Sequence, residues 1–180
     1  MPGIDVELRE IRADDKLTGL KLGDAEFAPL KTFLQKHSKK FHANDLAKSY
    51  ALFAQEGGNA KVIGYITLLC GEVVTDERGG LLEADLLYKY PSYPAVKIAR
   101  LAVDVRYQRG RGLGTNLVEF ALGLVKQSIC PAIGCRFMVV DAKKKSVPFY
   151  EKRGFTLLDT EANKKLDAPV MFIDLTKISI

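Results

Sequence analysis

Glycines and arginines alternate in one short stretch, Arg109-Gly110-Arg111-Gly112-Leu113-Gly114, immediately before an apolar pattern with helical spacing. Glycine allows a tight turn and a close approach of the backbone to a ligand. A helix that begins after such a turn presents free N–H groups and the positive end of its dipole, and arginine adds charged donors. The stretch therefore predicts a phosphate-binding turn. The alternative is a turn that uses glycine only for its tight geometry.

The spacing Arg109-x-x-Gly112-x-Gly114 resembles the R/Q-x-x-G-x-G/A signature of the GNAT family of N-acetyltransferases. It differs from the glycine patterns of dinucleotide-binding folds and of P-loops. The family wraps this turn around the pyrophosphate of acetyl-coenzyme A. The resemblance thus implies cofactor contacts from Gln108, Arg109, Gly110, Arg111, Gly112, Gly114 and Thr115. Both Gln108 and Arg109 fit the first polar position, and both are kept as candidates.

The strand before this turn is the second part of the resemblance. It implies that the edge formed by Leu101, Ala102 and Val103 donates and accepts backbone hydrogen bonds along the pantetheine arm, in a slot between splayed strands. A backbone N–H near Val103 would then polarise the thioester carbonyl. No general base stands out, because Glu72, Glu83 and Asp104 are candidates only through their acidity.

The third part is Phe149-Tyr150-Glu151-Lys152-Arg153-Gly154-Phe155, which resembles the family's F-Y-E-K-x-G-F segment. The resemblance implies that the Tyr150 hydroxyl is the catalytic acid that protonates the departing thiolate. A tyrosine is protonated at neutral pH, so this role needs no shift of its pKa. The alternative is that Tyr150 only packs, with its hydroxyl bonded to a backbone group.

Within the family, the order of motifs is most similar to the GNAT-type toxins of bacterial toxin–antitoxin pairs, which acetylate aminoacyl-tRNA. This similarity implies charged tRNA and a small DNA-binding antitoxin as partners. Basic residues for tRNA phosphates are available in one region, namely Lys143, Lys144, Lys145, Lys152 and Arg153. A solvated lysine-rich surface is the alternative for this group.

The elements that must position these motifs alternate between strands and helices, which predicts an α/β fold with a mixed central sheet flanked by helices. Strands are expected at 6–11, 49–54, 61–70, 99–105, 135–141, 155–158 and 170–175, and helices at 29–41, 113–125 and 146–153. The turn cluster Glu56-Gly57-Gly58-Asn59 predicts that the strands at 49–54 and 61–70 form a hairpin. Gly64 within the second of these strands predicts a bulge or a close approach. Residues 90–94 are expected to be irregular because of their two prolines. Ser146 and Gly154 are expected to cap the last helix.

The composition is that of a globular protein, with 180 residues, 47% hydrophobic and 27% charged. We expect a single N-acetyltransferase domain over 1–180, with a motif core at about 96–156. No apolar run reaches the roughly 20 residues of a membrane span. The three cysteines, Cys70, Cys130 and Cys135, lack metal-ligand spacing, so a cytoplasmic protein without a metal is expected.

The net charge is +5, and residues 100–153 carry 11 Lys/Arg against 4 Asp/Glu. This excess suits coenzyme A or nucleic acid. The leading function is acetyl-CoA-dependent N-acetylation of aminoacyl-tRNA. Acetylation of a small-molecule or protein amine and a non-catalytic acyl-CoA-binding module are the alternatives. A homodimer is one assembly that the sequence allows.

Overall fold

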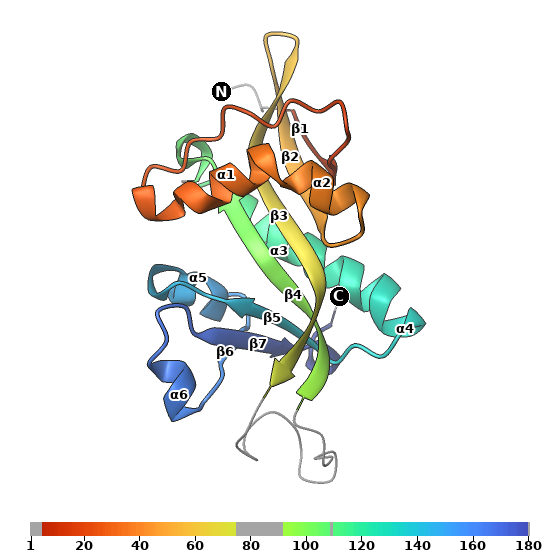
Figure 1. Cartoon of the computed structure of the whole chain (residues 1–180), viewed down its shortest axis with the longest axis vertical. Helices are drawn as coiled ribbons and strands as arrows, with labels where there is room; N and C mark the ends of the chain where they lie inside the picture. The colour runs from red at the N-terminus through yellow and green to blue at the C-terminus, as the bar shows by residue number, and fades with distance from the viewer. Residues whose placement is uncertain (1–4, 75–91, 109, 180) are drawn as a thin grey trace. The chain divides into compact units, whose positions relative to one another are not determined.

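The computed structural model describes residues 5–74, 92–108 and 110–179 (Figure 1). Its strands are β1 (Val6–Glu10), β2 (Lys48–Glu56), β3 (Asn59–Val74), β4 (Ser92–Val103), β5 (Phe137–Asp141), β6 (Thr156–Leu157) and β7 (Val170–Asp174). Its helices are α1 (Ala28–Lys36), α2 (Ser38–Ala43), α3 (Leu113–Leu124), α4 (Cys130–Ala132), α5 (Val147–Glu151) and α6 (Glu161–Lys164). Among the described residues, no helix has the length and apolarity needed to cross a bilayer.

The strands form a seven-stranded sheet in the order β1-β2-β3-β4-β5-β7-β6. The β4–β5 pair is parallel, whereas the β1–β2, β2–β3, β5–β7 and β6–β7 pairs are antiparallel. The predicted mixed α/β sheet is therefore confirmed. The chain divides into two compact units, 1–69 with 99–120 and 70–98 with 121–180.

The first unit is built on a β-hairpin, as the sequence predicts. Gly57 and Gly58 join β2 to β3 with φ of 57° and 81°, the left-handed conformations that a two-residue hairpin turn requires. The register shifts between Leu52, which pairs with Gly64, and Phe53, which pairs with Val62, and this shift marks a bulge in β3 next to Gly64. A Cβ on Gly64 would lie 3.2 Å from the carbonyl oxygen of Ala102. Both expectations for Gly64 are therefore confirmed.

Helices cover both faces of this part of the sheet, with α1 and α2 on one face and α3 on the other (Figure 1). Successive residues of a strand point to opposite faces. Ala51 and Phe53 accordingly join Phe33 and Leu34 of α1 in one core cluster. Tyr50 points to the other face, where its ring meets that of Phe120 of α3 edge-on at 4.9 Å between centroids.

The helix expected over 29–41 is divided into two. His37 leaves the helical conformation at φ −124°, and α2 begins after it. The Ser38 hydroxyl donates to the carbonyl oxygen of Leu34 at 2.5 Å. A serine that bonds to the preceding turn competes with the backbone ladder. The Ser38 hydrogen bond thus accompanies the break at His37, which the helical spacing of apolar residues did not indicate.

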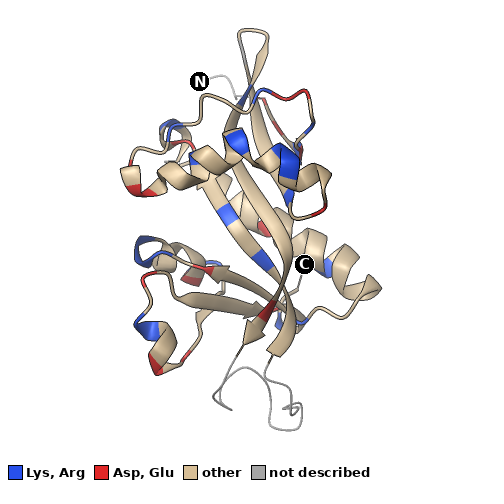
Figure 2. Ribbon diagram, in the orientation of Figure 1, with Lys and Arg blue, Asp and Glu red and all other residues tan. Residues whose placement is uncertain are grey.

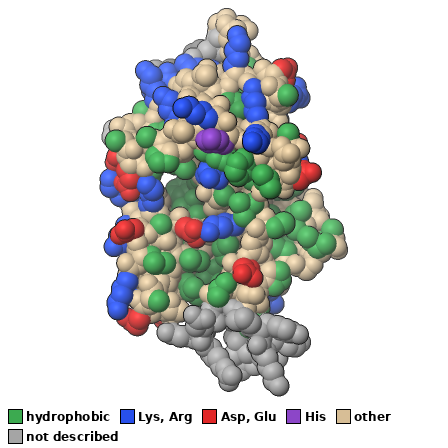
Figure 3. Space-filling view, viewed as in Figure 1, with side chains coloured by type: hydrophobic (Ala, Val, Ile, Leu, Met, Phe, Trp, Pro, Cys, Tyr) green, Lys and Arg blue, Asp and Glu red, His purple; other side chains and the backbone are tan. Residues whose placement is uncertain are grey.

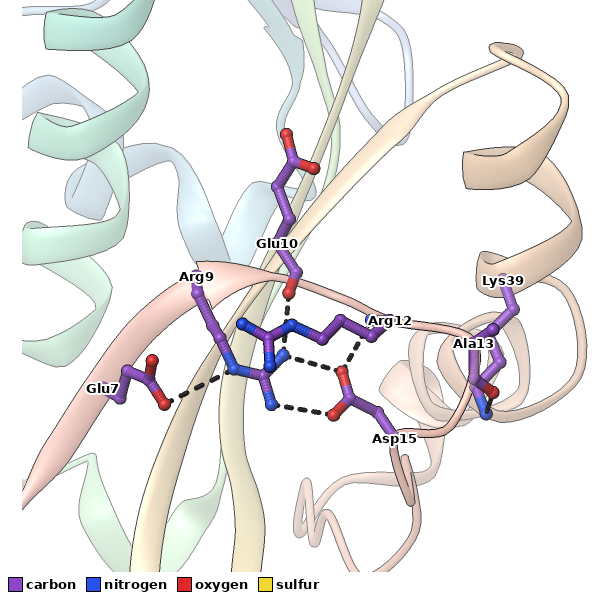
Figure 4. A network of polar contacts seen from close by, with 7 residues as sticks. All are labelled: Glu7, Arg9, Glu10, Arg12, Ala13, Asp15 and Lys39. Atoms are coloured by element: carbon purple, nitrogen blue, oxygen red, sulfur yellow. Dashed lines mark hydrogen bonds and ion pairs between the residues drawn. The ribbon is translucent and has the colours of Figure 1, made fainter.

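The segment after β1 is held by Arg9 and Asp15 (Figure 4). The Arg9 guanidinium donates two hydrogen bonds to the Asp15 carboxylate, at 2.8 and 2.7 Å, and lies 3.9 Å from the centre of the Phe53 ring. Lys39 of α2 donates to the carbonyl oxygen of Ala13 at 2.7 Å. These contacts fix the segment so that the nearby Leu17 is buried in the core cluster.

The second unit contains β5, β7 and β6 with the first half of β4, and its core includes Phe137, Val139 and Leu158. The expectation that 90–94 is irregular is wrong for residues 92–94, because β4 begins at Ser92; residues 90 and 91 lie outside the described part. Proline lacks only the donor, and the carbonyl oxygen of Pro94 still accepts the Arg136 N–H at 3.0 Å.

The helix after the glycine turn continues past its expected end. A π-helical turn, Val125–Ile129, follows α3 and leads into α4, where Pro131 occupies the first turn. A π turn is one way in which a helix accommodates an irregular backbone position. Pro131 therefore lies inside the continued helix, which ends at Ala132.

Candidate functional site

The end of β4 presents backbone N–H groups beyond the part of the strand that pairs with β5. The Asp104 N–H donates to the carbonyl oxygen of Ile63 in β3 at 2.8 Å. Because neighbouring residues of a strand direct their N–H groups to opposite sides, Leu101 and Val103 direct theirs away from β3. The register of β4 with β5 runs from Ala95 to Ile98 and does not include them. Of the three predicted residues, these two have the orientation needed to bond an extended ligand.

Ala102 faces the other way. Its carbonyl oxygen is the atom that a Cβ on Gly64 would approach, and its side chain is buried in the core cluster with Phe33. Its backbone is therefore directed toward β3. On the predicted cofactor edge, Ala102 separates Leu101 from Val103 and does not direct its own N–H toward the ligand.

The glycine turn adopts the conformations that its sequence predicts. Gly110 and Gly112 have φ of 75° and 63°, which other residues rarely adopt. A Cβ on Gly110 would meet nothing within 4 Å, so the space beside the turn is open. The first helical bond of α3 runs from the Asn116 N–H to the carbonyl oxygen of Gly112 at 2.9 Å. The N–H groups of Leu113 and Gly114 precede this bond and have no acceptor within the helix.

The exposed side chain of Arg111 lies beside these donors, with its guanidinium 5.3 Å from the centre of the Tyr107 ring. Thr115 lies in the first turn of α3 and makes contacts of its own. The turn thus combines open space, main-chain donors and a cation, and this combination fits a pyrophosphate.

Gln108 and Arg109 are the two candidates for the first polar position of the signature, and the structure describes Gln108. The Gln108 amide nitrogen donates to the carbonyl oxygen of Val103 at 2.8 Å, so this side chain ties the turn to the end of β4. Arg109 lies outside the described residues, and its part in phosphate binding stays a prediction. The geometry gives Gln108 a positioning role in the turn.

Asp104 is the anchor of this region. Its carboxylate is 0% exposed and accepts hydrogen bonds from the Lys21 N–H at 2.9 Å and from the Arg106 N–H at 3.0 Å. The Arg106 guanidinium adds two more, at 2.9 and 2.7 Å. Burial raises the pKa of Asp104, but these hydrogen bonds outweigh it and hold the pKa below its usual value. A carboxylate stabilised in its charged form is a poor proton acceptor, so Asp104 is not suited to be the general base.

Tyr150 lies in α5 of the second unit. Its ring meets those of Phe149 and Phe155 edge-on, at 5.1 and 5.4 Å between centroids, and the residue is 5% exposed. Its hydroxyl makes no hydrogen bond with any residue in the described part of the chain. Burial raises the pKa of the Tyr150 hydroxyl above its usual value, so the group stays protonated at neutral pH. A protonated hydroxyl without a protein acceptor is available to a ligand, which speaks against the packing alternative.

The start and end of α5 differ in how they match the prediction. Ser146 makes no side-chain cap, and its N–H instead donates to the carbonyl oxygen of Lys143 at 2.6 Å, within a 3-10 turn (Lys144–Ser146). Gly154 closes the segment at φ 84°, followed by a hydrogen bond from the Phe155 N–H to the carbonyl oxygen of Tyr150 at 3.1 Å. The predicted N-cap is therefore wrong, and the predicted glycine end is confirmed.

The predicted basic residues flank α5 on both sides, and the ribbon of Figure 2 is coloured blue there. Lys144, Lys145 and Lys152 are exposed. Lys143 and Arg153 are half-buried, and the Arg153 guanidinium lies 5.0 Å from the centre of the Phe149 ring. Exposed cations of this kind suit phosphate contacts, although they are equally compatible with a solvated surface.

Sequence reasoning did not single out Arg100 and Phe33. The Arg100 guanidinium lies 3.6 Å from the centre of the Phe33 ring, in the wall of a cavity of about 560 Å³. A charged residue in the middle of a predicted apolar strand was the available signal. Within the described residues, no three His, Cys, Asp or Glu side chains cluster as a metal site.

Comparison with known proteins identifies relatives over most of the chain. Residues 8–155 match the acetyltransferase (GNAT) family. The tRNA-acetylating toxin of Mycobacterium tuberculosis (strain ATCC 25618 / H37Rv) is 28% identical over 134 residues, which cover 74% of each chain.

The protein AtaT is similar in structure as well. The structure of AtaT complexed with acetyl-methionyl-tRNAfMet has a TM-score of 0.78 and 27% identity, covering 96% of both chains. AtaTR bound with acetyl-CoA has a TM-score of 0.74 and 28% identity, covering 96% of this chain and 95% of that chain. A mutant of AtaT bound to the C-terminus of the antitoxin AtaR has a TM-score of 0.74 and 26% identity, covering 96% and 94%.

Proposed function

The chain belongs to the acetyltransferase (GNAT) family, and from this premise we propose that it transfers the acetyl group of acetyl-CoA to the amino group of aminoacyl-tRNA. The observation that carries the proposal is the similarity to AtaT in complex with acetyl-methionyl-tRNAfMet, which extends over 96% of this chain. The tRNA-acetylating toxin of Mycobacterium tuberculosis supports the same acceptor.

Acetyl-CoA binding is assigned to the turn between β4 and α3. The left-handed Gly110 and Gly112 expose the backbone, and the N–H groups at the start of α3 are directed at the pyrophosphate. Arg111 adds charge to the same group. The edge of Leu101 and Val103 hydrogen-bonds the pantetheine arm, as its orientation away from β3 allows.

The reaction places each of these groups in a defined role. The amine nitrogen attacks the thioester carbonyl carbon, and the Val103 N–H stabilises the negative charge that develops on the oxygen. The carbon–sulfur bond then breaks, and the Tyr150 hydroxyl gives its proton to the departing thiolate. The new amide nitrogen loses one proton to solvent, and Tyr150 is reprotonated from solvent, so protons and electrons balance.

Two macromolecular partners follow from the same relatives. The basic residues that flank α5 are assigned to the phosphates of charged tRNA. An antitoxin is assigned as a protein partner, because a mutant of AtaT is bound to the C-terminus of the antitoxin AtaR in a related structure. DNA binding is assigned to the same partner, because the related KacTA has been solved as a complex with DNA. The presence of a small DNA-binding protein encoded beside the gene tests this second assignment.

The experiment that tests the acceptor uses acetyl-CoA labelled in the acetyl group. We expect label to be transferred to aminoacyl-tRNA but not to the same tRNA after deacylation, which serves as the matched control. Thermal unfolding with and without acetyl-CoA is measured in parallel, since a ligand of the native state raises the Tm by mass action.

The two readouts separate the parts of the proposal. A folded protein whose Tm does not respond to saturating acetyl-CoA would contradict the cofactor assignment. A normal response to acetyl-CoA, with transfer to polyamines or peptide amines and none to charged tRNA, would retain the acetyltransferase and overturn the acceptor.

A further inference from the structure

A cavity of about 560 Å³ that is open to solvent lies in the first unit, between α1 and β4. Its walls are formed largely by apolar side chains, including Pro29, Leu30 and Phe33 of α1 and Ala99 of β4. Its volume falls within the range of about 300 to 1,000 Å³ that is typical of small-ligand sites. A cavity of this size and composition can hold a planar, weakly polar group.

Arg100 is the charged residue in this cavity. Its guanidinium is stacked on the Phe33 ring at 3.6 Å, and the residue is partly buried. Within the described residues, Arg100 makes no hydrogen bond or ion pair. Stacking uses the face of the guanidinium and leaves its edge, which carries the N–H donors, for a planar arrangement of acceptors. The cavity is open to solvent, so this edge is accessible and an anionic ligand can take the place of water on it.

The surroundings of the cavity are also cationic. Residues 28–43, which form α1 and α2, contain four lysines and no Asp or Glu. Three of these lysines are exposed, namely Lys31, Lys36 and Lys40. Figure 3 shows Lys and Arg side chains gathered over these helices. Such a field attracts a polyanion and repels a cationic acceptor.

We propose that the cavity between α1 and β4 binds a nucleotide of the single-stranded acceptor end of tRNA, with its phosphate on the edge of Arg100 and its base against the apolar wall. Arginine binds phosphate through paired hydrogen bonds, and unstacked bases of single strands pack on apolar and aromatic side chains. A purely apolar ligand would contact the wall but would leave the Arg100 guanidinium without an anionic partner. This inference rests on the proposed tRNA acceptor and assigns Arg100 and Phe33 as specificity-determining residues.

The test uses adenosine 5′-monophosphate (AMP) as a probe, titrated by calorimetry into protein already saturated with coenzyme A so that the cofactor site is filled. Adenosine and inorganic phosphate are titrated in the same way. We expect AMP to bind more tightly than either part alone, and Arg100→Gln to weaken AMP about tenfold or more with little effect on adenosine. Arg100→Lys keeps the charge but loses the planar fork, so its affinity should lie between the two.

Lys36→Gln is the matched control, because it removes one exposed charge from α1 outside the cavity wall, and it should change AMP affinity by less than about twofold. Thermal unfolding of each variant verifies its fold, and Phe33→Leu gives a second, independent loss of the stacking platform. In kinetics, Arg100→Gln should raise the KM for aminoacyl-tRNA while the KM for acetyl-CoA is unchanged.

Three results would overturn the inference: equal AMP affinity in wild type and Arg100→Gln, inorganic phosphate that binds as tightly as AMP, or AMP that is displaced by coenzyme A. If AMP binding depends on Arg100 but charged tRNA is not acetylated, the nucleotide site stands and the acceptor proposed above is wrong.

Discussion

Replacement of Tyr150 by Phe is expected to separate chemistry from stability. The hydroxyl makes no hydrogen bond within the described chain, and the contacts of the ring with Phe149 and Phe155 are retained by phenylalanine. The free energy of unfolding should therefore change by less than about 0.5 kcal/mol. Turnover should fall about 10²-fold or more if the hydroxyl protonates the thiolate. That loss corresponds to about 2.7 kcal/mol in the barrier.

A second buried tyrosine provides the matched control. The Tyr65 hydroxyl donates to the carbonyl oxygen of Leu30 at 2.6 Å, and the residue is 0% exposed. Tyr65→Phe leaves that carbonyl without its donor, so it should cost about 1–3 kcal/mol of stability. Its effect on turnover should be much smaller than that of Tyr150→Phe. The two variants are thus expected to show opposite patterns in stability and activity.

The assay combines chemical denaturation with single-turnover acetyl transfer, so that product release does not mask the chemical step. Burial raises the pKa of Tyr150, so wild-type turnover should show no loss from tyrosine ionisation as the pH rises to about 10, the usual pKa of tyrosine. Wild-type single-turnover rates in Tyr150→Phe would refute the acid role. A stability loss as large as that of Tyr65→Phe would show that the hydroxyl has a structural partner.

Three further outcomes are expected. Asp104→Asn should lower the free energy of unfolding by about 2–4 kcal/mol in urea denaturation. Because the native pKa of Asp104 is lowered, its contribution to stability is present above about pH 4 and is lost as the pH falls further. The variant should therefore lose less stability on acidification than the wild type. Gly112→Asp should remove most of the Tm increase caused by acetyl-CoA, since it places a carboxylate where the turn is assigned to phosphate, and an undiminished increase would contradict that assignment. Combined replacement of Lys143, Lys144 and Lys145 by Ala should reduce the salt slope of tRNA binding by about two to three units while acetylation of a small amine is retained, and an unchanged slope would mean that these lysines are only solvated.

The features that the sequence alone determined are those set by local conformation. Gly57 and Gly58 predict the hairpin because its turn requires left-handed residues, and Gly110 and Gly112 predict the cofactor turn for the same reason. Alternation and helical spacing located the strands and helices around these turns. The family resemblance, carried by the glycine turn and the Tyr150 segment, is confirmed by the match over residues 8–155.

Contacts between residues that are far apart in the sequence could not be predicted from local patterns. The Asp104 carboxylate binds the N–H of Lys21, which is 83 positions away in the chain, and this bond changes Asp104 from a candidate base into an anchor. The break at His37 and the strand conformation of Pro94 also depend on neighbours that no local pattern specifies. Local propensity is a weak preference that tertiary packing overrides.

The cavity between α1 and β4 shows this division most clearly. The sequence places an arginine within an apolar strand and a phenylalanine on an amphipathic helix, 67 positions apart. Only the packing of α1 against β4 brings the Arg100 guanidinium onto the Phe33 ring, and its edge has no acceptor among the described residues. The chemistry of each side chain is a property of the sequence, whereas the fold decides which part of it faces a ligand, because stacking covers the face of the guanidinium and leaves its edge toward the open cavity.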